Sequence, residues 1–310
     1  MSNNSFEAKD VSVVIPTVRG GDDLSRALNS VIPQNVHKII VVFNGSNANE
    51  MHYSFVSKNK FTTQTNIKFL IFPEISSAPL ARNFGMNEVT STLVHFLDDD
   101  DWVEPNFYDQ LTKLFTINCI GVVSSVIVHD DIDLTVKDKS IKSLSVIKRN
   151  LLICDNKVGV TSGVILKSNY FRLVGGFDDK MPARQDYLLW IALSEYGDFI
   201  ATKDCLLHWV DHSSTLSISN SDGISKHIVA IDLLSEVLDS IIANESKSNL
   251  KIMRKSKAAR FKYLCRISLK QGNLNLAILY LVKSLLMFPT LSVISLFLPK
   301  KIKLLMRKLF

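Results

Sequence analysis

Four consecutive aspartates are the residues of this sequence best suited to chemistry. Asp98 to Asp101 directly follow the apolar run 93–97. Adjacent carboxylates repel one another, so a folded protein keeps them where solvent or a cation compensates their charge. Alternate aspartates of an extended turn can bind Mg²⁺ or Mn²⁺ through oxygen, and such an ion can bridge to a diphosphate. The other interpretation is a solvated loop whose last aspartates cap the helix after Pro105, and the run alone leaves both open.

Glycine-rich phosphate-binding motifs that would claim these carboxylates do not occur in the sequence. There is no G-x-x-x-x-G-K-[ST], which excludes a P-loop NTPase, and no G-x-G-x-x-G after the first apolar run, which argues against a dinucleotide-binding fold. A diphosphate bound here needs another source of positive charge, and a metal ion provides it.

Apolar runs that alternate with amphipathic stretches predict the elements that position the aspartates. Continuous Val/Ile/Leu strands separated by helices are typical of a mainly parallel α/β sheet covered on both faces. Ligands of such sheets bind beyond the carboxyl ends of the strands, where Thr17, Asn44 and the four aspartates fall. We expect strands at 11–15, 39–43, 67–72, 93–97 and 158–167, helices at about 22–31, 80–89 and 186–195, and an insertion or loop at 130–150.

The charge of the chain is unevenly distributed. The 310 residues include 36 Lys+Arg and 30 Asp+Glu, for a net charge of +6. From Lys247 to Phe310 there are 15 bases and no acid, so the first 246 residues carry 21 bases and 30 acids, a net charge of −9. Such a basic region indicates a polyanionic partner, either a membrane or nucleic acid. Because no nucleic-acid-binding motif accompanies it, we expect no nucleic acid.

Composition narrows the class of protein further. Hydrophobic residues make up 46% and charged residues 21%, which is typical of a globular protein. Four separated cysteines without a C-x-x-C pair argue against a disulfide scaffold or a zinc ribbon and suit a reducing compartment. The polar, acid-containing first ten residues are unlike a signal peptide, and no repeat of 20–50 residues is visible. We therefore predict a cytoplasmic globular protein.

Six short segments follow one another at ordinary spacings. They are Val11–Thr17 (VSVVIPT), Ile40–Ser46 (IVVFNGS), Ala81–Gly85 (ARNFG), Phe96–Asp101 (FLDDDD) with Pro105, Gly175–Asp178 (GGFD) and Gln185–Trp190 (QDYLLW). In this order the segments resemble glycosyltransferase family 2, the large inverting family with the GT-A fold, over about the first 215 residues. The resemblance implies a Rossmann-like, mainly parallel sheet flanked by helices in a catalytic domain at 1–220. A basic α-helical region at 221–310 would follow it.

The resemblance implies a nucleotide-sugar site at the ends of the strands. Arg82 would pair with the phosphates of the donor, and Asn44 would contact the base. The residues implied to bind the nucleotide sugar are Pro16, Thr17, Arg19, Asn44, Arg82, Asp98 and Asp99.

The resemblance also implies a metal site and a catalytic base. Asp98 and Asp100 match the D-x-D of the family, with Asp100 as the direct ligand of Mn²⁺ or Mg²⁺, and Asp101 would support the turn. His212 matches a late histidine that approaches the metal in some members. Asp186 matches the base that takes the proton of the acceptor hydroxyl, and Asp178 near the acceptor is the next candidate.

Two positions depart from the family pattern. Phe43 stands where many members have Asp, which bears on the recognition of uracil. Gln185 replaces a common Glu beside the base, whereas Asp186 itself is kept.

The expected activity is the transfer of a sugar, with inversion, from a nucleotide-diphosphate donor, a UDP-sugar, to an acceptor hydroxyl. The expected acceptor is a lipid-linked or growing glycan of a bacterial surface polysaccharide such as the O-antigen of lipopolysaccharide. One alternative, a sugar nucleotidyltransferase, needs a longer Gly-rich, Arg-containing loop than 17–21. The other, a catalytically silent nucleotide-sugar-binding subunit, would lack the base or the metal aspartates, and this chain has both.

The C-terminal region is predicted to be helical, with a break near Gly272. Residues 284–299 are uncharged but number only 16 and include Pro289, short of the ~20 that a spanning helix needs. Residues 300–310 have the pattern of an interfacial helix attracted to anionic lipid. We therefore expect a peripheral protein at the inner face of the cell membrane. The alternative is a helical hairpin with a solvated basic face, which fits the residues before about Gly272.

Overall fold

The computed structural model divides into two compact units. It describes residues 6–59, 61, 66–75, 77–142, 145–212, 223–245, 250–290, 293 and 295–297. The first unit contains residues 1–152, 157–180 and 184–215, and the second contains residues 153–156, 181–183 and 216–310.

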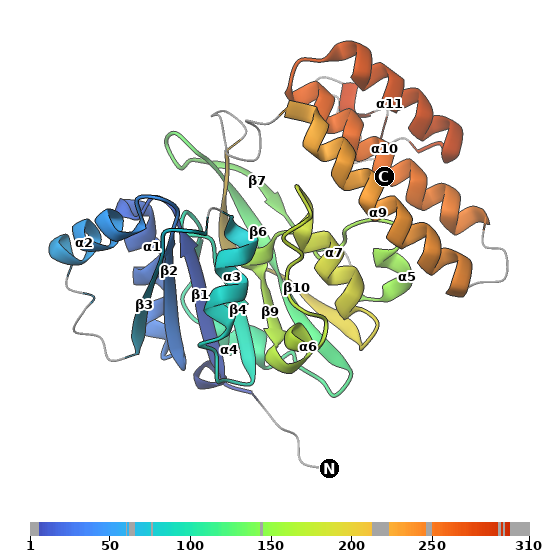
Figure 1. Cartoon of the computed structure of the whole chain (residues 1–310). Helices are drawn as coiled ribbons and strands as arrows, with labels where there is room; N and C mark the ends of the chain where they lie inside the picture. The colour runs from blue at the N-terminus through green and yellow to red at the C-terminus, as the bar shows by residue number, and fades with distance from the viewer. Residues whose placement is uncertain are drawn as a thin grey trace. The chain divides into compact units, whose positions relative to one another are not determined.

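A ten-stranded mixed sheet forms the centre of the first unit (Figure 1). Its main path runs β3-β2-β1-β4-β9-β6-β10-β5, with β7 paired to β6 and β8 paired to β10. The strands are β1 (Val11–Thr17), β2 (Lys38–Asn44), β3 (Ile67–Phe72), β4 (Leu93–Phe96), β5 (Trp102–Val103), β6 (Cys119–Asp130), β7 (Val136–Ser140), β8 (Val146–Ile147), β9 (Val164–Lys167) and β10 (Asp198–Asp211).

The first four strands of the path are parallel, as their continuous apolar runs predict. All seven residues of β1 are buried, because helices cover the sheet on both faces. Beyond β4 the directions mix: β9 is antiparallel to both β4 and β6, while β6 and β10 are parallel. Apolar runs predict where strands lie but not their direction, which is why the antiparallel half appears only in the structure.

Side chains alternate between two cores along each central strand. Val13 and Ile15 of β1 belong to the core beneath α1, α2 and α4, whereas Val14 belongs to the core beneath α3, α6 and α7. The helices of this unit are α1 (Gly21–Val31), α2 (Ala48–Lys58), α3 (Ala78–Met86), α4 (Phe107–Thr112), α5 (Arg149–Leu152), α6 (Ser168–Leu173) and α7 (Gln185–Leu193), with 3₁₀ turns at Ala8–Asp10, Ile32–Gln34 and Thr161–Gly163.

Helix α3 lies unusually close to the sheet. A Cβ added at Gly85 would lie 2.5 Å from a methyl group of Val14 and 3.1 Å from one of Val42, so only glycine fits. Ser77 caps the first turn by accepting a hydrogen bond from the amide of Leu80. This close packing fixes the helix that carries Arg82.

The second unit is helical. It contains α9 (Gly223–Glu245), α10 (Leu250–Lys270), α11 (Leu274–Met287) and a 3₁₀ turn at Ser295–Phe297. Asn273 caps α11 by accepting from the amide of Leu276, and Gly272 at φ +73° ends α10, as the predicted break requires. No helix in the described ranges is long and apolar enough to cross a membrane.

Some predicted elements differ from the structure. Only 164–167 of the expected strand 158–167 is extended, because the 3₁₀ turn at 161–163 precedes it. Within 130–150, β7 and β8 add short strands at the edges of β6 and β10. The predicted domain boundary near 220 and the helix at 300–310 lie outside the described residues.

Candidate active site

The aspartate run lies against the loop that follows β1. The hydroxyl of Thr17 donates to Asp99 Oδ2 at 2.6 Å and accepts from the amide of Gly20 at 2.8 Å. The guanidinium of Arg19 donates to Asp99 Oδ1 at 2.9 Å and to Asp100 Oδ2 at 2.6 Å. Segments about 80 residues apart are thereby joined at the carboxyl ends of β1 and β4, where the sheet topology predicts a ligand site.

The four aspartates divide into a buried pair and a more accessible pair. Burial raises the pKa of Asp99 to about 6, although the charge of Arg19 acts in the opposite direction. Burial also raises the pKa of Asp101 well above its ordinary value, and this carboxylate accepts from the amide of Val210 at 3.0 Å. Asp99 and Asp101 therefore hold the turn, and the side chains of the alternate residues Asp98 and Asp100 are more exposed, at 35% and 13%.

Arg82 pairs with the aspartate run, and its charge also acts on the pKa of the predicted base. Its guanidinium forms an ion pair with Asp98 and lies 5.4 Å from the ring centre of Phe177. Burial raises the pKa of Asp186, the charges of Arg184 and Arg82 act to lower it, and the charge of Asp98 raises it. Asp186, at the start of α7, thus shares one electrostatic environment with Arg82 and Asp98.

His212 is the second side-chain partner of Asp100. Its Nε2 lies 2.6 Å from Asp100 Oδ2, and this hydrogen bond is the main reason that the pKa of His212 is raised. Its Nδ1 lies 3.8 Å from Asp131 Oδ2, on a side chain that is 1% exposed. No sequence signal pointed to Asp131, because only the fold brings residue 131 to this site.

The donor types at this point fit a hard divalent cation. Asp100 and His212 offer a carboxylate oxygen and an imidazole nitrogen, ligands that Mn²⁺ accepts. In this structure Arg19 forms an ion pair with Asp100, and His212 forms a hydrogen bond with it. Within the described ranges, no group of three or more His, Cys, Asp or Glu side chains is arranged to hold a metal ion. A cation here would need a diphosphate or water to complete its coordination.

Two predicted nucleotide contacts lie deeper in the sheet. Pro16 is buried in β1 beside Val42, and Asn44 is 1% exposed at the end of β2. The side-chain amide of Asn44 donates to the carbonyl of Ile75 at 3.3 Å. Its buried Oδ1 has no hydrogen-bond partner in the part of the chain that the structure describes. Neither residue hydrogen-bonds to the aspartate run in that part.

Asn83 is a positioning residue that sequence reasoning missed, although it lies inside a quoted motif. Its Nδ2 donates to the carbonyl of Phe177 at 2.7 Å, and its Oδ1 accepts from the amide of Phe177 at 2.9 Å. A Cβ at Gly176 (φ +78°) would lie 2.6 Å from Asn83 Oδ1, so the close approach requires glycine. The ARNFG and GGFD segments thus fix each other, and together they place the ring of Phe177 beside Arg82.

The buried side chain of His95 contacts Ser162, which in turn hydrogen-bonds to the aspartate run. Ser162 accepts from the amide of Asp98 at 3.1 Å, and its carbonyl lies 2.7 Å from Nε2 of His95. Because a carbonyl only accepts, Nε2 carries the proton and Nδ1 accepts from the hydroxyl of Tyr108 at 3.0 Å. Burial lowers the pKa of His95 to about 4, so this side chain is a neutral core residue.

Trp102 packs behind the aspartates. Its ring stacks on His208 with centroids 4.8 Å apart, and the guanidinium of Arg26 lies 4.7 Å from its centre. Arg26 also donates to the carbonyl of Asp100 at 2.9 Å. These contacts fix the backbone of Asp100.

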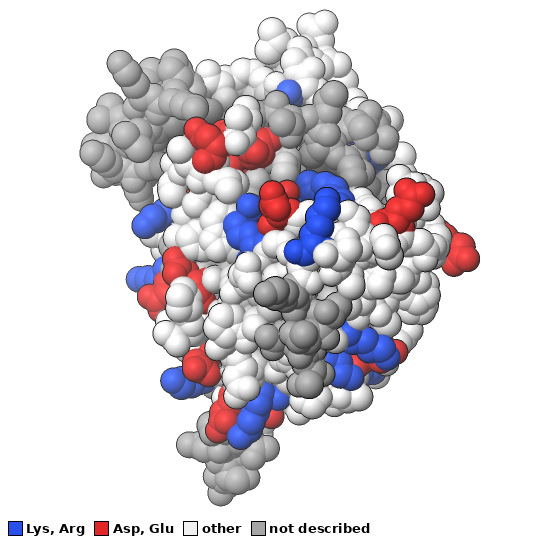
Figure 2. Space-filling view, turned by 90° about the vertical axis from the view of Figure 1, so that its left-hand side faces the viewer, with Lys and Arg blue, Asp and Glu red and all other residues white. Residues whose placement is uncertain are grey.

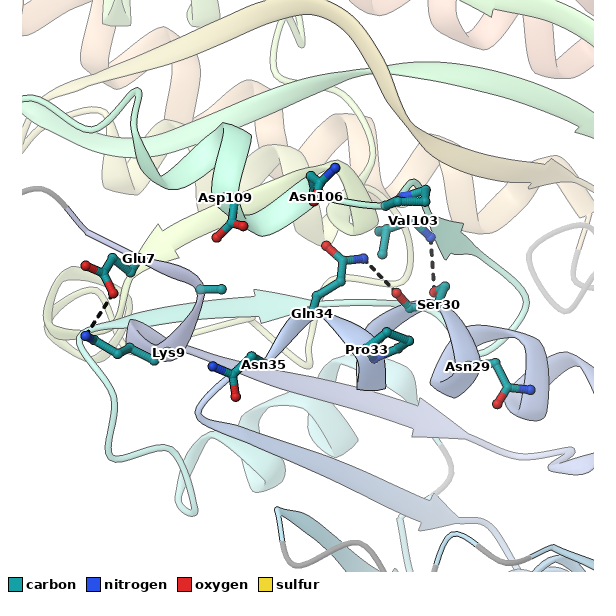
Figure 3. A pocket seen from close by; sticks show the side chains of 12 residues that line it. Glu7, Lys9, Asn29, Ser30, Pro33, Gln34, Asn35, Val103, Asn106 and Asp109 are labelled. Atoms are coloured by element: carbon teal, nitrogen blue, oxygen red, sulfur yellow. Dashed lines mark hydrogen bonds and ion pairs between the residues drawn. The ribbon is translucent and has the colours of Figure 1, made fainter.

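A separate cavity in the first unit contains none of the predicted site residues (Figure 3). It has a volume of about 420 Å³ and is lined in part by Gln34 and Asp109. Gln34 Nε2 donates to the carbonyls of Ser30 and Glu104, at 2.6 and 3.1 Å, so this amide is satisfied within the protein. The convergent charged groups lie at the strand ends instead.

Known sequences are similar to this chain. The family described as Glycosyl transferase family 2 matches residues 12–166, half of the chain. An uncharacterised glycosyltransferase of Rickettsia conorii is 25% identical over 234 residues, which are 70% of this chain and 36% of that protein. The pre-mycofactocin glycosyltransferase of Mycobacterium tuberculosis is 25% identical over 223 residues, 67% of this chain and 44% of that protein. The chain therefore spans less than half the length of these curated relatives.

Known structures are similar in fold. The crystal structure of S. aureus TarS 1-349 in complex with UDP-GlcNAc has a TM-score of 0.56 at 10% identity, covering 89% of this chain and 91% of that one. A mannosyltransferase from Pyrobaculum calidifontis in complex with GDP-Man and Mn²⁺ has a TM-score of 0.54 at 13% identity, covering 99% and 82%. At these identities the likeness shows the fold alone.

Proposed function

Because this chain belongs to glycosyltransferase family 2 and has the GT-A fold, we propose that it transfers a sugar from a nucleotide diphosphate to an acceptor hydroxyl with inversion. The observation that carries the proposal is the pairing of Arg19 with Asp100 and of Arg82 with Asp98 beyond the carboxyl ends of β1 and β4, where the charges of Arg82 and Asp98 also act on the pKa of Asp186 in α7. In this proposal residues 1–220 are the catalytic domain and residues 221–310 are a basic helical region.

The diphosphate of the donor would lie between Arg19 and Arg82. Each guanidinium is already held by a carboxylate of the turn, so its position is set before the donor arrives. A divalent cation held by Asp100 and His212, with Asp98 beside it, would offset the negative charge that develops on the leaving diphosphate. The mannosyltransferase that contains Mn²⁺ supports this assignment.

Asp186 would act as the general base. Burial raises its pKa, which makes the carboxylate a stronger proton acceptor, while Arg184 and Arg82 favour its ionised form. It would take the proton of the acceptor hydroxyl as the hydroxyl oxygen bonds to the anomeric carbon. The nucleoside diphosphate would leave from the opposite face of the sugar, so that one displacement inverts the configuration.

We propose a UDP-sugar as donor and a lipid-linked or growing glycan of a bacterial surface polysaccharide as acceptor. The TarS structure with UDP-GlcNAc supports the uridine nucleotide, and the mannosyltransferase with GDP-Man makes the guanosine nucleotide the main competitor. Phe43 near the end of β2 bears on which nucleotide is bound, because its side chain is buried and offers no polar group to a base. A lipid-linked acceptor would place the protein at the inner face of the cell membrane.

The test is a donor panel with the purified chain. UDP-, GDP- and dTDP-sugars are incubated with short soluble glycan acceptors, with and without Mn²⁺, and the release of nucleoside diphosphate is measured beside the thermal shift. We expect Mn²⁺-dependent stabilisation and release with UDP-sugars, and release lost in Asp186→Asn. Stabilisation without release from any donor would indicate a silent binding subunit. Consumption of a nucleoside triphosphate and a sugar phosphate with release of pyrophosphate would indicate a nucleotidyltransferase.

A further inference from the structure

Helix α11 displays a row of apolar side chains to solvent. Four of them follow one another at intervals of four residues and therefore lie along one side of the helix. These four are Leu274 (61% exposed), Ile278 (52%), Val282 (47%) and Leu286 (68%), and Leu279 (45%) lies beside them. We call these five residues the α11 row.

The opposite side of α11 packs against α10. Ala277, Tyr280 and Ser284 are buried, and the hydroxyl of Ser284 donates to the carbonyl of Ala258 in α10 at 2.8 Å. Since α11 already has one face that packs, the α11 row is a second apolar face. Single exposed apolar side chains are ordinary, but a contiguous row along a helix marks an interaction surface.

Basic side chains accompany the α11 row. Residues 250–287 contain nine Lys+Arg and no Asp or Glu. Lys283 is exposed beside Val282, and Lys270 is exposed at the end of α10, just before the row begins. At the far end the guanidinium of Arg254 donates to the carbonyls of Met287 and Leu286, at 2.9 and 3.4 Å. Positive charge therefore lies at both ends of the row and on the adjoining side of α11, where Lys283 Nζ is 5.7 Å from the ring centres of Phe261 and Tyr280.

Helix α9 also exposes a row of apolar side chains, but acidic residues lie beside that row. Val229, Leu233 and Val237 are also spaced by four residues and are 50%, 37% and 37% exposed. Asp232 and Glu236 are exposed between them. On the face of the molecule in Figure 2, acidic and basic side chains are interspersed as well. Among the described helices, α10 and α11 combine an exposed apolar row with bases and no acid of their own, while Lys257 and Arg260 of α10 pair with Asp239 of α9.

We propose that the α11 row and the basic residues around it bind the surface of an anionic lipid bilayer. The apolar side chains would enter the boundary between headgroups and acyl chains, and the lysines and arginines would contact lipid phosphates. The 14 residues of α11 span about 21 Å, less than the ~30 Å of a hydrocarbon core, so the helix lies along the surface. This surface gives the proposed transferase a place beside a lipid-linked acceptor, but its binding to lipid does not depend on that activity.

The test is sedimentation of the full chain with vesicles. We expect binding to phosphatidylcholine vesicles with 30% phosphatidylglycerol, weak binding to phosphatidylcholine alone, and partial release at 1 M salt, where charge is screened. The variant Ile278→Ser/Val282→Ser should bind about tenfold or more weakly, because two apolar side chains no longer enter the bilayer. The matched control Val229→Ser/Val237→Ser on α9 should bind like the parent chain. Circular dichroism and thermal melting establish that both variants are folded.

Three outcomes would overturn the proposal. Equal weakening by the α9 and α11 variants would mean that the α11 row has no special role. Unchanged binding of the α11 variant, with binding lost on deletion of 299–310, would assign the membrane contact to that tail alone. A parent chain that ignores anionic vesicles but is dimeric by light scattering, and becomes monomeric in the α11 variant, would assign the row to a second copy. Nucleoside diphosphate release in solution, measured on the same variants, reports separately on the proposed activity.

Discussion

At the scale of single residues, Asp186 is the group whose chemistry the site constrains most tightly. Asp186→Asn keeps the size of the side chain but removes its ability to accept a proton as a carboxylate. We expect kcat to fall by about 100- to 10,000-fold, because the proton is taken only as the transition state forms. The affinity for the donor, measured by calorimetry, should change little. A comparable loss of donor affinity, or a mild loss of kcat, would move the base elsewhere, with Asp178 as the next candidate.

Asp100 differs from Asp186 because it forms an ion pair with Arg19 and a hydrogen bond with His212. Asp100→Asn should abolish transfer and remove the stabilisation that UDP gains from Mn²⁺, since a neutral amide is a poor ligand for a hard cation. The readout is the thermal shift with UDP alone and with UDP and Mn²⁺. Asp109→Asn, a carboxylate change in the separate cavity of Figure 3, is the control and should keep the Mn²⁺ effect. Wild-type turnover and metal dependence in Asp100→Asn would show that the D-x-D assignment is wrong.

His95 makes the stability of the fold depend on pH. Burial lowers its pKa from 6.5 to about 4, so between these values the unfolded chain binds more protons than the folded one. Stability from this group is complete above about pH 6.5 and is lost as the pH falls toward 4. The shift corresponds to about 3 kcal/mol as an upper order of magnitude. Denaturant unfolding of His95→Gln at pH 7 and pH 4.5 should show a smaller loss on acidification than the parent chain. An equal loss in both would contradict this.

At the scale of elements, the pairing of α3 with the GGFD turn explains how Arg82 is held. Asn83→Ala removes both hydrogen bonds to the backbone of Phe177, at a cost of about 2 kcal/mol. We expect a lower melting temperature and a higher KM for the donor, because the ring beside Arg82 is no longer fixed. The exposed Asn87→Ala at the end of the same helix is the control and should change neither quantity. An unchanged KM in a folded Asn83→Ala would separate the GGFD turn from donor binding.

At the scale of the whole molecule, the short segments 153–156 and 181–183 belong to the second unit, although the residues on either side of them in the sequence belong to the first. Ile153 and Met181 are each 3% exposed, and the hydroxyl of Ser256 donates to the carbonyl of Ile153 at 2.7 Å. Deletion of 223–310 should therefore lower the melting temperature by more than the single hydrogen bond lost in Ser256→Ala, which is worth about 1 kcal/mol. Differential scanning calorimetry of the parent chain, the deletion variant and Ser256→Ala measures the three melting temperatures. A deletion variant as stable as the parent chain would show that the first unit is independent of these helices.

The amino-acid sequence by itself determined the elements and the family. Continuous apolar runs predict the four parallel strands because a strand buried on both faces needs apolar residues at every position. The six ordered segments identify the family, and both the family and the GT-A fold are confirmed. Gly272 and Asn273 signal the break between α10 and α11 through local backbone chemistry, which needs no distant partner.

Only the tertiary structure decided which side chains meet. The run of four aspartates does not by itself show how its members differ. In the structure Asp99 bonds to Thr17 and Arg19, whereas Asp100 bonds to Arg19 and His212. The direction of β9, the contact of His212 with Asp131 and the bonds of Asn83 to Phe177 all join residues far apart in the chain. Sequence patterns report local preference and burial, whereas these contacts depend on how strands are ordered in the sheet. The exposed row on α11 arises in the same way, because a helical pattern shows an apolar face but only packing shows which face remains uncovered.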